Sequence, residues 1–374
     1  MDVDLMWWLT RSLFVGGGIA GAGLALLYTL QEKLIYVPRL PGLPNPYVYT
    51  PTRFGLQYED VHFKAKDGTK LHGWMLYPQD WKRGAMRKRP TVLFFQENAG
   101  NMNMRLPYLR LLILSLNCSV FAPSYRGYGQ SSGSPSEAGL KQDAEASLET
   151  LLQRQDVNPS KIVCLGKSLG GAVGIDLTAK HKDKFAAAVF ENTFTSITDV
   201  APKVLPFLKH LIGQGRPANW LIRNKWNSLE QIPKLQGLPL LLMSSLQDEL
   251  LPPAQMQQLY KAVTASGSKD CTWVEFEDAG HMDAYEVAQQ EYWPALMQFF
   301  KRHGLGQDHW DAPADDDIDD KEAYDSADES AEVIEDSQQQ GNGLTHRAGA
   351  AAVQKAAQEP GSSVHVNGVS AKTS

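Results

Sequence analysis

The sequence predicts an α/β fold, a mostly parallel sheet with helices on both faces, and two observations support that prediction. Short runs rich in β-branched and aromatic residues recur along the chain, and the later runs alternate with stretches of helical periodicity. The 374 residues are 43% apolar and 21% charged, which suits a globular chain with a sizeable core. Strands that alternate with helices form parallel sheets, and their ligand sites lie at the carboxyl ends of the strands.

The first element is an uncharged stretch from Ser12 to Leu30, which is long enough to cross the apolar core of a bilayer as a helix. Aromatic residues typical of membrane interfaces flank it at Trp7, Trp8, Tyr28 and Tyr36. We therefore predict one transmembrane anchor at residues 12–31 and a linker at residues 32–57, rich in Pro, Gly and Asn from residue 38. A cleaved signal peptide is the alternative, but the apolar stretch is long for one and no small-x-small site precedes a polar break.

The charges beside the anchor favour one orientation. Arg11 before it is opposed by Asp2 and Asp4. Basic residues follow it at Lys33, Arg39 and Arg53. The positive-inside rule then favours a cytosolic main domain. The membrane is expected to be an endomembrane or the plasma membrane. The pattern Gly17-x-x-x-Gly21 adds the hypothesis of a weak dimer through the anchor helix.

The main domain is expected at residues 58–306. Its expected strands are 58–63, 71–76, 91–95, 119–122, 161–165, 186–190, 238–243 and 272–276. Its expected helices are 103–116, 136–154, 169–181, 253–265 and 285–303. The cysteines Cys118, Cys164 and Cys271 are few and far apart, so no disulfide framework is expected.

The motif Gly166-Lys167-Ser168-Leu169-Gly170 lies between an expected strand and an expected helix. A strained strand-to-helix turn lifts a serine hydroxyl off the sheet, and small residues on either side let the strand and the helix approach each other. The bare G-x-S-x-G pattern is common, but its place between a strand and a helix is specific. It predicts the α/β-hydrolase fold, with Ser168 as the nucleophile.

A serine nucleophile needs a base to take its proton and a carboxylate to fix the tautomer of that base. In this fold the three residues follow one another in the order serine, acid, histidine. Asp248 follows the seventh expected strand and is the predicted acid, with Glu249 in reserve. His281 follows the last expected strand and is the predicted base. Asp283, on the same loop, is expected to cap the last helix.

Acyl transfer also needs donors for a developing oxyanion. The backbone N–H of Leu169 is the expected first donor, because it comes directly after the nucleophile. The second is expected from the loop after the strand at 91–95, from Asn98 or alternatively from Glu97. The other interpretation of this loop is a polar turn that only caps the helix at 103.

A helical cap is predicted at residues 194–230, where an insertion crosses the strand ends. Its apolar residues are Val204, Leu205, Phe207, Leu208, Leu211, Ile212, Trp220, Leu221, Ile222 and Trp226. An apolar cap suits a lipid-like acyl chain. Core packing is the alternative explanation of such a helical apolar stripe.

The last segment, residues 307–374, is predicted to be a disordered acidic and polar tail. Residues 308–336 hold fourteen Asp and Glu against Lys321, a balance of −13, so with a net charge of −6 the remainder of the chain carries +7. The tail has few large apolar side chains to offset the entropy of ordering it. The rest of the chain has no Lys/Arg stripe interleaved with aromatics, so no nucleic-acid partner is expected.

Together these motifs resemble the family of alpha/beta hydrolase domain-containing protein 13 and its plant relatives, the wavy-growth proteins. The residues that carry the resemblance are Phe94–Asn101, Tyr125–Gly129, Gly166–Gly174, Glu191–Phe194, Asp248–Pro253 and His281–Asp283. The likeness covers the anchor and about residues 34–303. Gln96-Glu97 stands where many members have His-Gly, which is similar to the plant-type variant.

The resemblance implies a single-pass membrane serine hydrolase with relatives that look like palmitoyl-protein thioesterases. The expected partners are then the lipid bilayer and a lipid-like acyl substrate or acylated protein. Two rivals stay open, a lipase or esterase for glycerolipids or small esters and a non-catalytic membrane-tethered scaffold. A peptidase is less expected, since nothing resembles an added specificity domain. No metal or cofactor is expected, because neither ligand spacing nor a phosphate-binding glycine loop is found.

Overall fold

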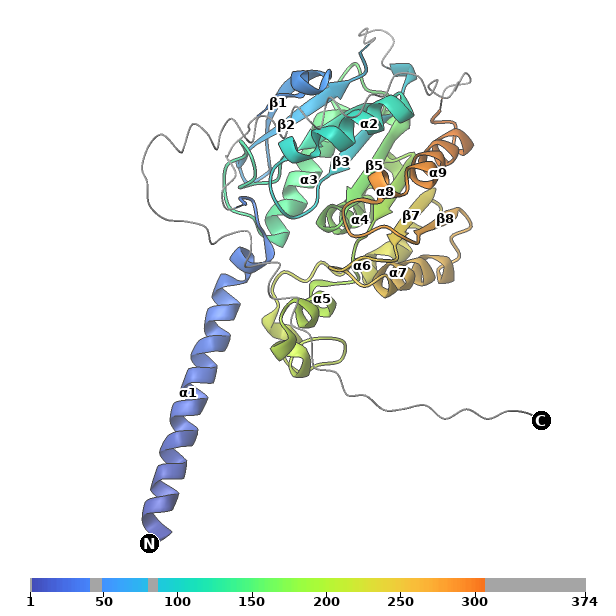
Figure 1. The fold of residues 1–374 in the computed structure, drawn as a ribbon. Coiled ribbons are helices and arrows are strands. Elements are labelled where there is room, and N and C mark those ends of the chain that lie inside the picture. The colour runs from blue at the N-terminus through green and yellow to red at the C-terminus, as the bar shows by residue number, and fades with distance from the viewer. Residues whose placement is uncertain (1, 41–48, 80–86, 307–374) are drawn as a thin grey trace, which may run out of the picture. The chain divides into compact units, whose positions relative to one another are not determined.

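An eight-stranded sheet with the order β1-β2-β4-β3-β5-β6-β7-β8 forms the centre of the computed structural model, which describes residues 2–40, 49–79 and 87–306 (Figure 1). Its strands are β1 (Gln57–Lys64), β2 (Lys70–Tyr77), β3 (Thr91–Phe95), β4 (Ser119–Pro123), β5 (Ile162–Lys167), β6 (Ala187–Glu191), β7 (Leu240–Ser245) and β8 (Cys271–Phe276). β2 pairs antiparallel with β1 and β4, and the strands from β4 to β8 run parallel. The predicted class is confirmed, and this order is that of an α/β-hydrolase fold.

The helices of the main domain follow the parallel strands. They are α2 (Leu106–Leu116), α3 (Glu137–Leu152), α4 (Leu169–Lys180), α7 (Ala254–Ala265), α8 (Ala284–Val287) and α9 (Gln289–Arg302). Short 3-10 helices are η1 (Pro51–Phe54), η3 (Met102–Arg105), η4 (Pro159–Lys161), η5 (Lys182–Lys184) and η8 (Ile232–Leu235). The helix predicted at 285–303 is divided into α8 and α9, because Ala288 leaves the helical conformation.

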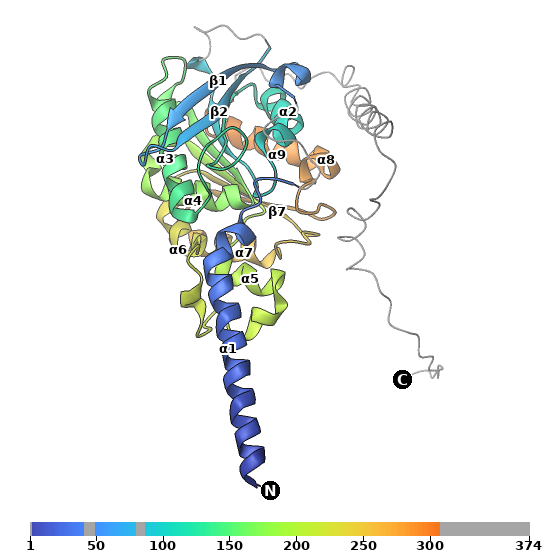
Figure 2. The ribbon, with the colours of Figure 1, turned by 90° about the vertical axis from the view of Figure 1, so that its left-hand side faces the viewer.

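The central strands of the sheet, β3 to β7, are buried on both faces, as their apolar residues require. In β3, Val92 and Phe94 join a cluster with α2 and α9, whereas Leu93 and Phe95 join a second cluster with α3, α4 and α7. All four side chains are fully buried. Successive residues of a strand point to opposite faces, so one strand supplies both cores. Figure 2 shows the helices on the two sides of the sheet.

The N-terminal helix α1 (Asp2–Ile35) continues past the predicted end of the anchor at residue 31. Gln31 donates from Nε2 to the carbonyl of Leu221 at 3.1 Å and accepts at Oε1 from the N–H of Arg223 at 2.7 Å. Tyr36 is 2% exposed and accepts from the indole N–H of Trp226 at 2.9 Å. The first residues of the predicted linker therefore pack on the main domain instead of forming a spacer. Residues 41–48 of that linker lie outside the described residues.

The predicted cap is helical and lies between β6 and β7. It contains α5 (Ile197–Val204), η6 (Pro206–His210), η7 (Asn219–Leu221) and α6 (Ser228–Gln231). Core packing explains Leu208, Ile212 and Trp226, which are buried. It does not explain the apolar side chains that the cap exposes, Phe207, Leu211 and Trp220. The predicted tail at 307–374 lies outside the described residues.

Candidate active site

Ser168 occupies a sharp turn between β5 and α4. Its backbone has φ 52° and ψ −117°, a conformation that costs a non-glycine residue free energy. The turn is held by its surroundings, because the N–H of Ser168 donates to the carbonyl of Glu191 at 2.9 Å and the hydroxyl of Thr193 donates to the Ser168 carbonyl at 2.7 Å. The predicted strand-to-helix turn is therefore present.

The glycines of the motif are required by close backbone contacts. A Cβ on Gly170 would lie 1.9 Å from the carbonyl oxygen of Phe95, and a Cβ on Gly166 would lie 2.2 Å from the carbonyl oxygen of Gly170. Both distances are far shorter than a van der Waals contact. Only glycine lets α4 start this close to β3 and β5, and this packing keeps Ser168 at the carboxyl end of the sheet.

The structure brings the three predicted catalytic residues together from three loops. Nε2 of His281 lies 2.9 Å from Oγ of Ser168, and Nδ1 of His281 lies 2.7 Å from Oδ2 of Asp248. Because a carboxylate only accepts, the proton on the ring belongs on Nδ1, and Nε2 then accepts from the serine hydroxyl. His281 is 5% exposed, so this chain of hydrogen bonds is shielded from water.

Asp248 and Glu249 have different surroundings. Oδ1 of Asp248 accepts from the N–H groups of Leu250 and Leu251 at 2.9 and 2.7 Å, which fixes the carboxylate in front of the imidazole. Oε2 of Glu249 instead lies 3.3 Å from the backbone nitrogen of His281. Asp248 therefore bonds to the imidazole ring of His281, and Glu249 contacts the backbone of the loop that carries this histidine.

Asp283 does not cap the last helix with its side chain, so the expectation from the sequence is wrong at this position. It precedes α8, but its Oδ1 accepts from the N–H of Gly280 at 2.7 Å. That bond closes the loop around His281. The side chain therefore shapes the histidine loop and leaves the helix end uncapped by a side chain.

Asn192 is a site residue to which the sequence analysis assigned no role. Its side chain is 3% exposed, donates to Oγ of Ser245 at 2.9 Å and to the carbonyl of His281 at 3.0 Å, and accepts from the N–H of Ser245 at 2.8 Å. It therefore ties the ends of β6 and β7 to the histidine loop. A polar residue directly after a buried strand is the signal that could have identified it.

The two predicted oxyanion donors differ in their geometry. Leu169 is the first residue of α4, and the first N–H groups of a helix have no partner within the helix. Asn98 instead donates from Nδ2 to the carbonyl of Ile35 and accepts from the hydroxyl of Tyr128 at 2.8 Å. Its side chain thus holds the end of α1, and a donor role for Asn98 is left to its backbone N–H.

A buried ion cluster lies directly beneath the nucleophile. Nζ of Lys167 lies 3.1 Å from Oε1 of Glu191 and 3.8 Å from Oε1 of Glu97, and Glu97 pairs with Nε of Arg105 at 2.5 Å. Burial disfavours the charged form of Glu97, but the Arg105 and Lys167 cations outweigh burial and hold the pKa of that carboxyl below its ordinary value. Glu97, the alternative oxyanion donor, therefore serves as an ion-pair acceptor with its side chain.

Replacing Lys167 with Met is expected to destabilise the fold by about 3–5 kcal/mol, because two buried carboxylates lose their shared cation. The stabilisation that comes from the lowered pKa of Glu97 is present above the ordinary Glu pKa of about 4.3 and is lost as the pH falls through the folded value. The deficit of Lys167→Met should therefore be largest at neutral pH and shrink in acid. Denaturant unfolding of both proteins at several pH values measures it, and a deficit independent of pH would contradict this account.

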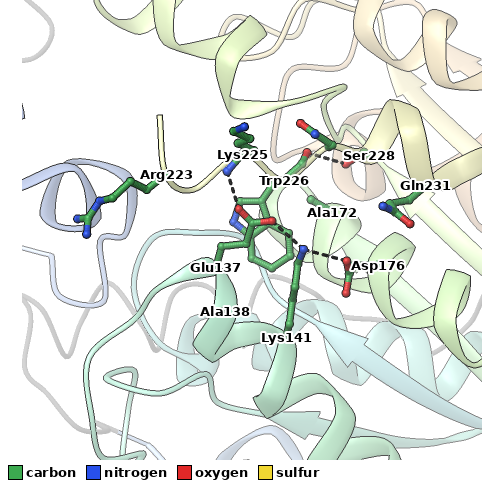
Figure 3. Close-up of a pocket in the computed structure, with 11 residues that line it drawn as sticks. Glu137, Ala138, Lys141, Ala172, Asp176, Arg223, Lys225, Trp226, Ser228 and Gln231 are labelled. Atoms are coloured by element: carbon green, nitrogen blue, oxygen red, sulfur yellow. Dashed lines mark hydrogen bonds and ion pairs between the residues drawn. The ribbon is translucent and has the colours of Figure 1, made fainter. Parts of the chain in front are cut away.

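A polar pocket of about 350 Å³ lies between α3, α4 and the cap (Figure 3). Nζ of Lys141 lies 2.7 Å from Oε1 of Glu137 and 2.9 Å from Oδ1 of Asp176. Glu137, Lys141 and Asp176 thus pair within the pocket, and none of the three predicted catalytic residues lines it, so we assign it a structural role. Over the described ranges of the chain, no group of three or more His, Cys, Asp or Glu side chains is placed to hold a metal ion.

Comparison with known proteins identifies similar chains. A model of the prolyl oligopeptidase family matches residues 136–306. The chain is 46% identical over 298 residues to the alpha/beta hydrolase domain-containing protein WAV2 of Arabidopsis thaliana, covering 78% of this chain and 94% of that protein. It is 33% identical over 303 residues to a Saccharomyces cerevisiae protein named uncharacterized membrane protein YNL320W, covering 80% of this chain and 100% of that one.

Solved structures share the fold at lower sequence identity. The Pyrococcus furiosus esterase Pf2001 matches with a TM-score of 0.56 and 20% identity, covering 72% of this chain and 97% of the esterase. Identity at this level shows the fold alone. The two eukaryotic relatives, in contrast, are matched over nearly their whole length.

Proposed function

Because the chain belongs to the α/β-hydrolase family of WAV2 and its relatives, we propose that it is a serine hydrolase that cleaves an ester or thioester through an acyl-enzyme. The observation that carries the proposal is the continuous set of hydrogen bonds from Ser168 through His281 to Asp248, with distances of 2.9 and 2.7 Å. Nucleophile, base and orienting acid are thus in the positions that acyl transfer needs.

In the first half of the reaction, Oγ of Ser168 bonds to the carbonyl carbon of the substrate and its proton moves to Nε2 of His281. The oxyanion that forms is stabilised by the N–H of Leu169. Collapse of this intermediate breaks the bond to the leaving thiol or alcohol, which takes the proton from His281. In the second half, water attacks the acyl-enzyme, His281 takes a proton from the water and returns it to Ser168, and the free acid leaves.

We propose a membrane location from the length and composition of α1. Met6–Ile35 is a candidate span of 30 residues, and an 18-residue window within it has a mean hydropathy of 1.8. Residues Leu13, Phe14 and Ile19 expose 75%, 77% and 69% of their side chains, which suits contact with lipid. The yeast relative is also named as a membrane protein. A cytosolic orientation and a weak dimer through Gly17 and Gly21 remain predictions from the sequence.

Within this chemistry we propose a long-chain acyl thioester as the substrate, as in palmitoyl-protein thioesterases. A membrane anchor keeps the site near acylated molecules, and the cap, which begins directly after Thr193, the residue that bonds to Ser168, is rich in apolar side chains. A lipase or esterase for glycerolipids or small esters would use the same three catalytic residues. The substrate panel described next separates these candidates.

The purified full chain in detergent is expected to hydrolyse acyl thioesters with kcat/KM rising with chain length. Each methylene that enters apolar surroundings contributes up to about 0.8 kcal/mol, or roughly fourfold, until the site is filled. The measurement compares thioesters of increasing chain length with glycerolipids and N-acyl peptides. Faster turnover of glycerolipids would select the lipase rival, and turnover of the peptides alone would select a peptidase.

A further inference from the structure

The tip of the cap exposes large apolar side chains. Phe207 is 64% exposed, Trp220 is 71% exposed and Leu211 is 40% exposed. Phe207 and Leu211 lie in and after η6, and Trp220 lies in η7. The N–H of Ala218 donates to the carbonyl of Leu211 at 3.0 Å, so the two segments that carry these apolar side chains are adjacent and form what we call the apolar tip. Large apolar side chains that gather in one exposed patch, unlike single scattered ones, mark surfaces that bind something apolar.

The same segment is basic. Between residues 197 and 227 the sequence has one acidic residue, Asp199, which accepts hydrogen bonds from the hydroxyls of Thr195 and Ser196 at 2.7 and 2.8 Å. Lys203, Lys209 and Arg216 are exposed in the same segment as the apolar tip. Aromatic side chains surrounded by Lys and Arg are typical of surfaces that enter the headgroup region of a bilayer.

The cap packs beside a known part of α1, so its depth in the membrane follows from the position of the proposed span. A narrow groove of about 90 Å³ is lined by Leu24 and Leu27 of α1 and by Leu205, Leu208 and Leu211 of the cap. Leu24 lies seven residues before Gln31, which is about 10 Å along the helix axis. Cap residues thus share a groove with the last two turns of the predicted anchor, and both views show the cap alongside these turns (Figures 1 and 2).

The contacts between α1 and the cap keep this arrangement in place. Gln31 bonds to the backbone of Leu221 and Arg223. Glu32 lies 2.5 Å from the guanidinium of Arg223 and 3.2 Å from Nδ2 of Asn224. A helix that leaves the membrane at residue 31 therefore carries the cap at the membrane surface. The groove is almost entirely apolar, which suits acyl chains and not water.

We infer that the cap is a membrane-docking surface, with Phe207, Leu211 and Trp220 inserted into an anionic leaflet and Lys203, Lys209 and Arg216 against its phosphates. This inference rests on the proposed membrane anchor, and it goes beyond it by assigning the cap a lipid partner. Anionic lipids are favoured because each Lys or Arg near such a surface adds attraction. Docking here also places the groove between α1 and the cap, which Ile197 and Ala201 of α5 line, within reach of acyl chains in the leaflet. Thr193 bonds to Ser168. Ile197 is four residues further along the chain, so Ile197 lies at most about 14 Å from Thr193.

The test uses the full chain in lipid nanodiscs, with bromine atoms on the upper part of the acyl chains as quenchers of tryptophan fluorescence. The quenching of Trp220 is obtained as the difference in tryptophan fluorescence between the unsubstituted chain and Trp220→Phe. We expect strong quenching of Trp220 in discs of anionic lipid and weaker quenching in zwitterionic discs. Unquenched Trp220 in both kinds of disc would overturn the docking surface. The exposed apolar side chains of the cap would then belong to a contact with a protein instead of a lipid.

A charge-reversed variant, Lys203→Glu with Lys209→Glu and Arg216→Glu, tests the basic part of the surface. It is expected to lose most of the Trp220 quenching in anionic discs. The matched control reverses three exposed lysines outside the cap, Lys261→Glu, Lys269→Glu and Lys301→Glu, and should keep it. Equal loss in both variants, or no loss in either, would overturn the assignment of an anionic leaflet.

The proposed function and this inference fail in different ways in the same experiment. Quenching of Trp7 and Trp8, measured through their Phe variants, reports insertion of the anchor. Hydrolysis of a thioester reports the catalytic proposal. Quenched Trp7 and Trp8 with unquenched Trp220 would retain the anchor and reject the cap surface. Quenched Trp220 without hydrolysis would retain the cap surface and reject the enzyme.

Discussion

Ser168→Ala is expected to lower kcat by about a millionfold, because the nucleophile, base and acid act as one unit in enzymes of this kind. Only catalysis by the oxyanion donors and by substrate binding would remain. Labelling by a fluorophosphonate probe should be lost completely, since the probe forms its bond with an activated serine hydroxyl. Rate measurements on a thioester substrate and gel detection of the probe give the two results.

The fold should survive this substitution. Alanine carries the same Cβ as serine, so it meets the same backbone strain at φ 52°, and the bonds from Ser168 N–H to Glu191 and from Thr193 to the Ser168 carbonyl involve the main chain. An unchanged unfolding temperature would establish that lost activity is a chemical effect. Ser160→Ala, at an exposed serine in η4, is the control and should keep both readouts. Full activity and labelling in Ser168→Ala would leave the non-catalytic scaffold as the explanation.

The positions of Ser168 and Asp248 were predictable because the strands that precede them, β5 and β7, are buried on both faces. Every residue of β5 and β7 is buried, and each strand begins with an apolar run, Ile162–Leu165 and Leu240–Met243, so their ends are visible in the sequence as a change to Gly, Ser and Asp. Parallel strands bring their carboxyl ends to one edge of the sheet. Ser168, Asp248 and His281 follow three such ends, and the structure places them in hydrogen-bond contact.

The role of Asn98 was not predictable in the same way. Its side chain contacts Ile35, which lies 63 positions earlier in the sequence, through an irregular loop that has no periodicity. Sequence patterns report local conformation and burial, and they carry no information on which distant loop supplies a partner. The junction between α1 and the main domain therefore became visible only in three dimensions.

Lys167 shows a second limit of sequence reasoning. A lysine at the variable position of G-x-S-x-G is ordinarily assigned to the surface, yet this side chain is 3% exposed. Its burial depends on Glu191 from β6 and on Glu97 from the loop after β3, both of which are far away in sequence. The pairing of Lys167 with Glu97 also explains why this chain has Gln96-Glu97 where many members of the family have His-Gly, because Glu97 completes a buried ion cluster here.

Asp248→Asn is expected to lower kcat by about 10⁴-fold while leaving the fold intact. The introduced asparagine can keep an acceptor oxygen for the N–H groups of Leu250 and Leu251, so the loop retains its shape. Its amide nitrogen, however, donates towards Nδ1 of His281. The ring proton then moves to Nε2, which faces Ser168 and can no longer accept the serine proton.

Glu249→Gln is the matched control, because it makes the same change one residue further along the loop. Glu249 lies 3.3 Å from the backbone nitrogen of His281 and does not reach the ring nitrogens that Asp248 and Ser168 occupy. Losing its charge weakens one hydrogen bond, at about 1 kcal/mol, so at most about a tenfold loss of kcat is expected. The two rates decide which carboxylate orients the base. A large loss in Glu249→Gln with a small one in Asp248→Asn would reverse the assignment, and it would mean that the loop after β7 rearranges when substrate binds.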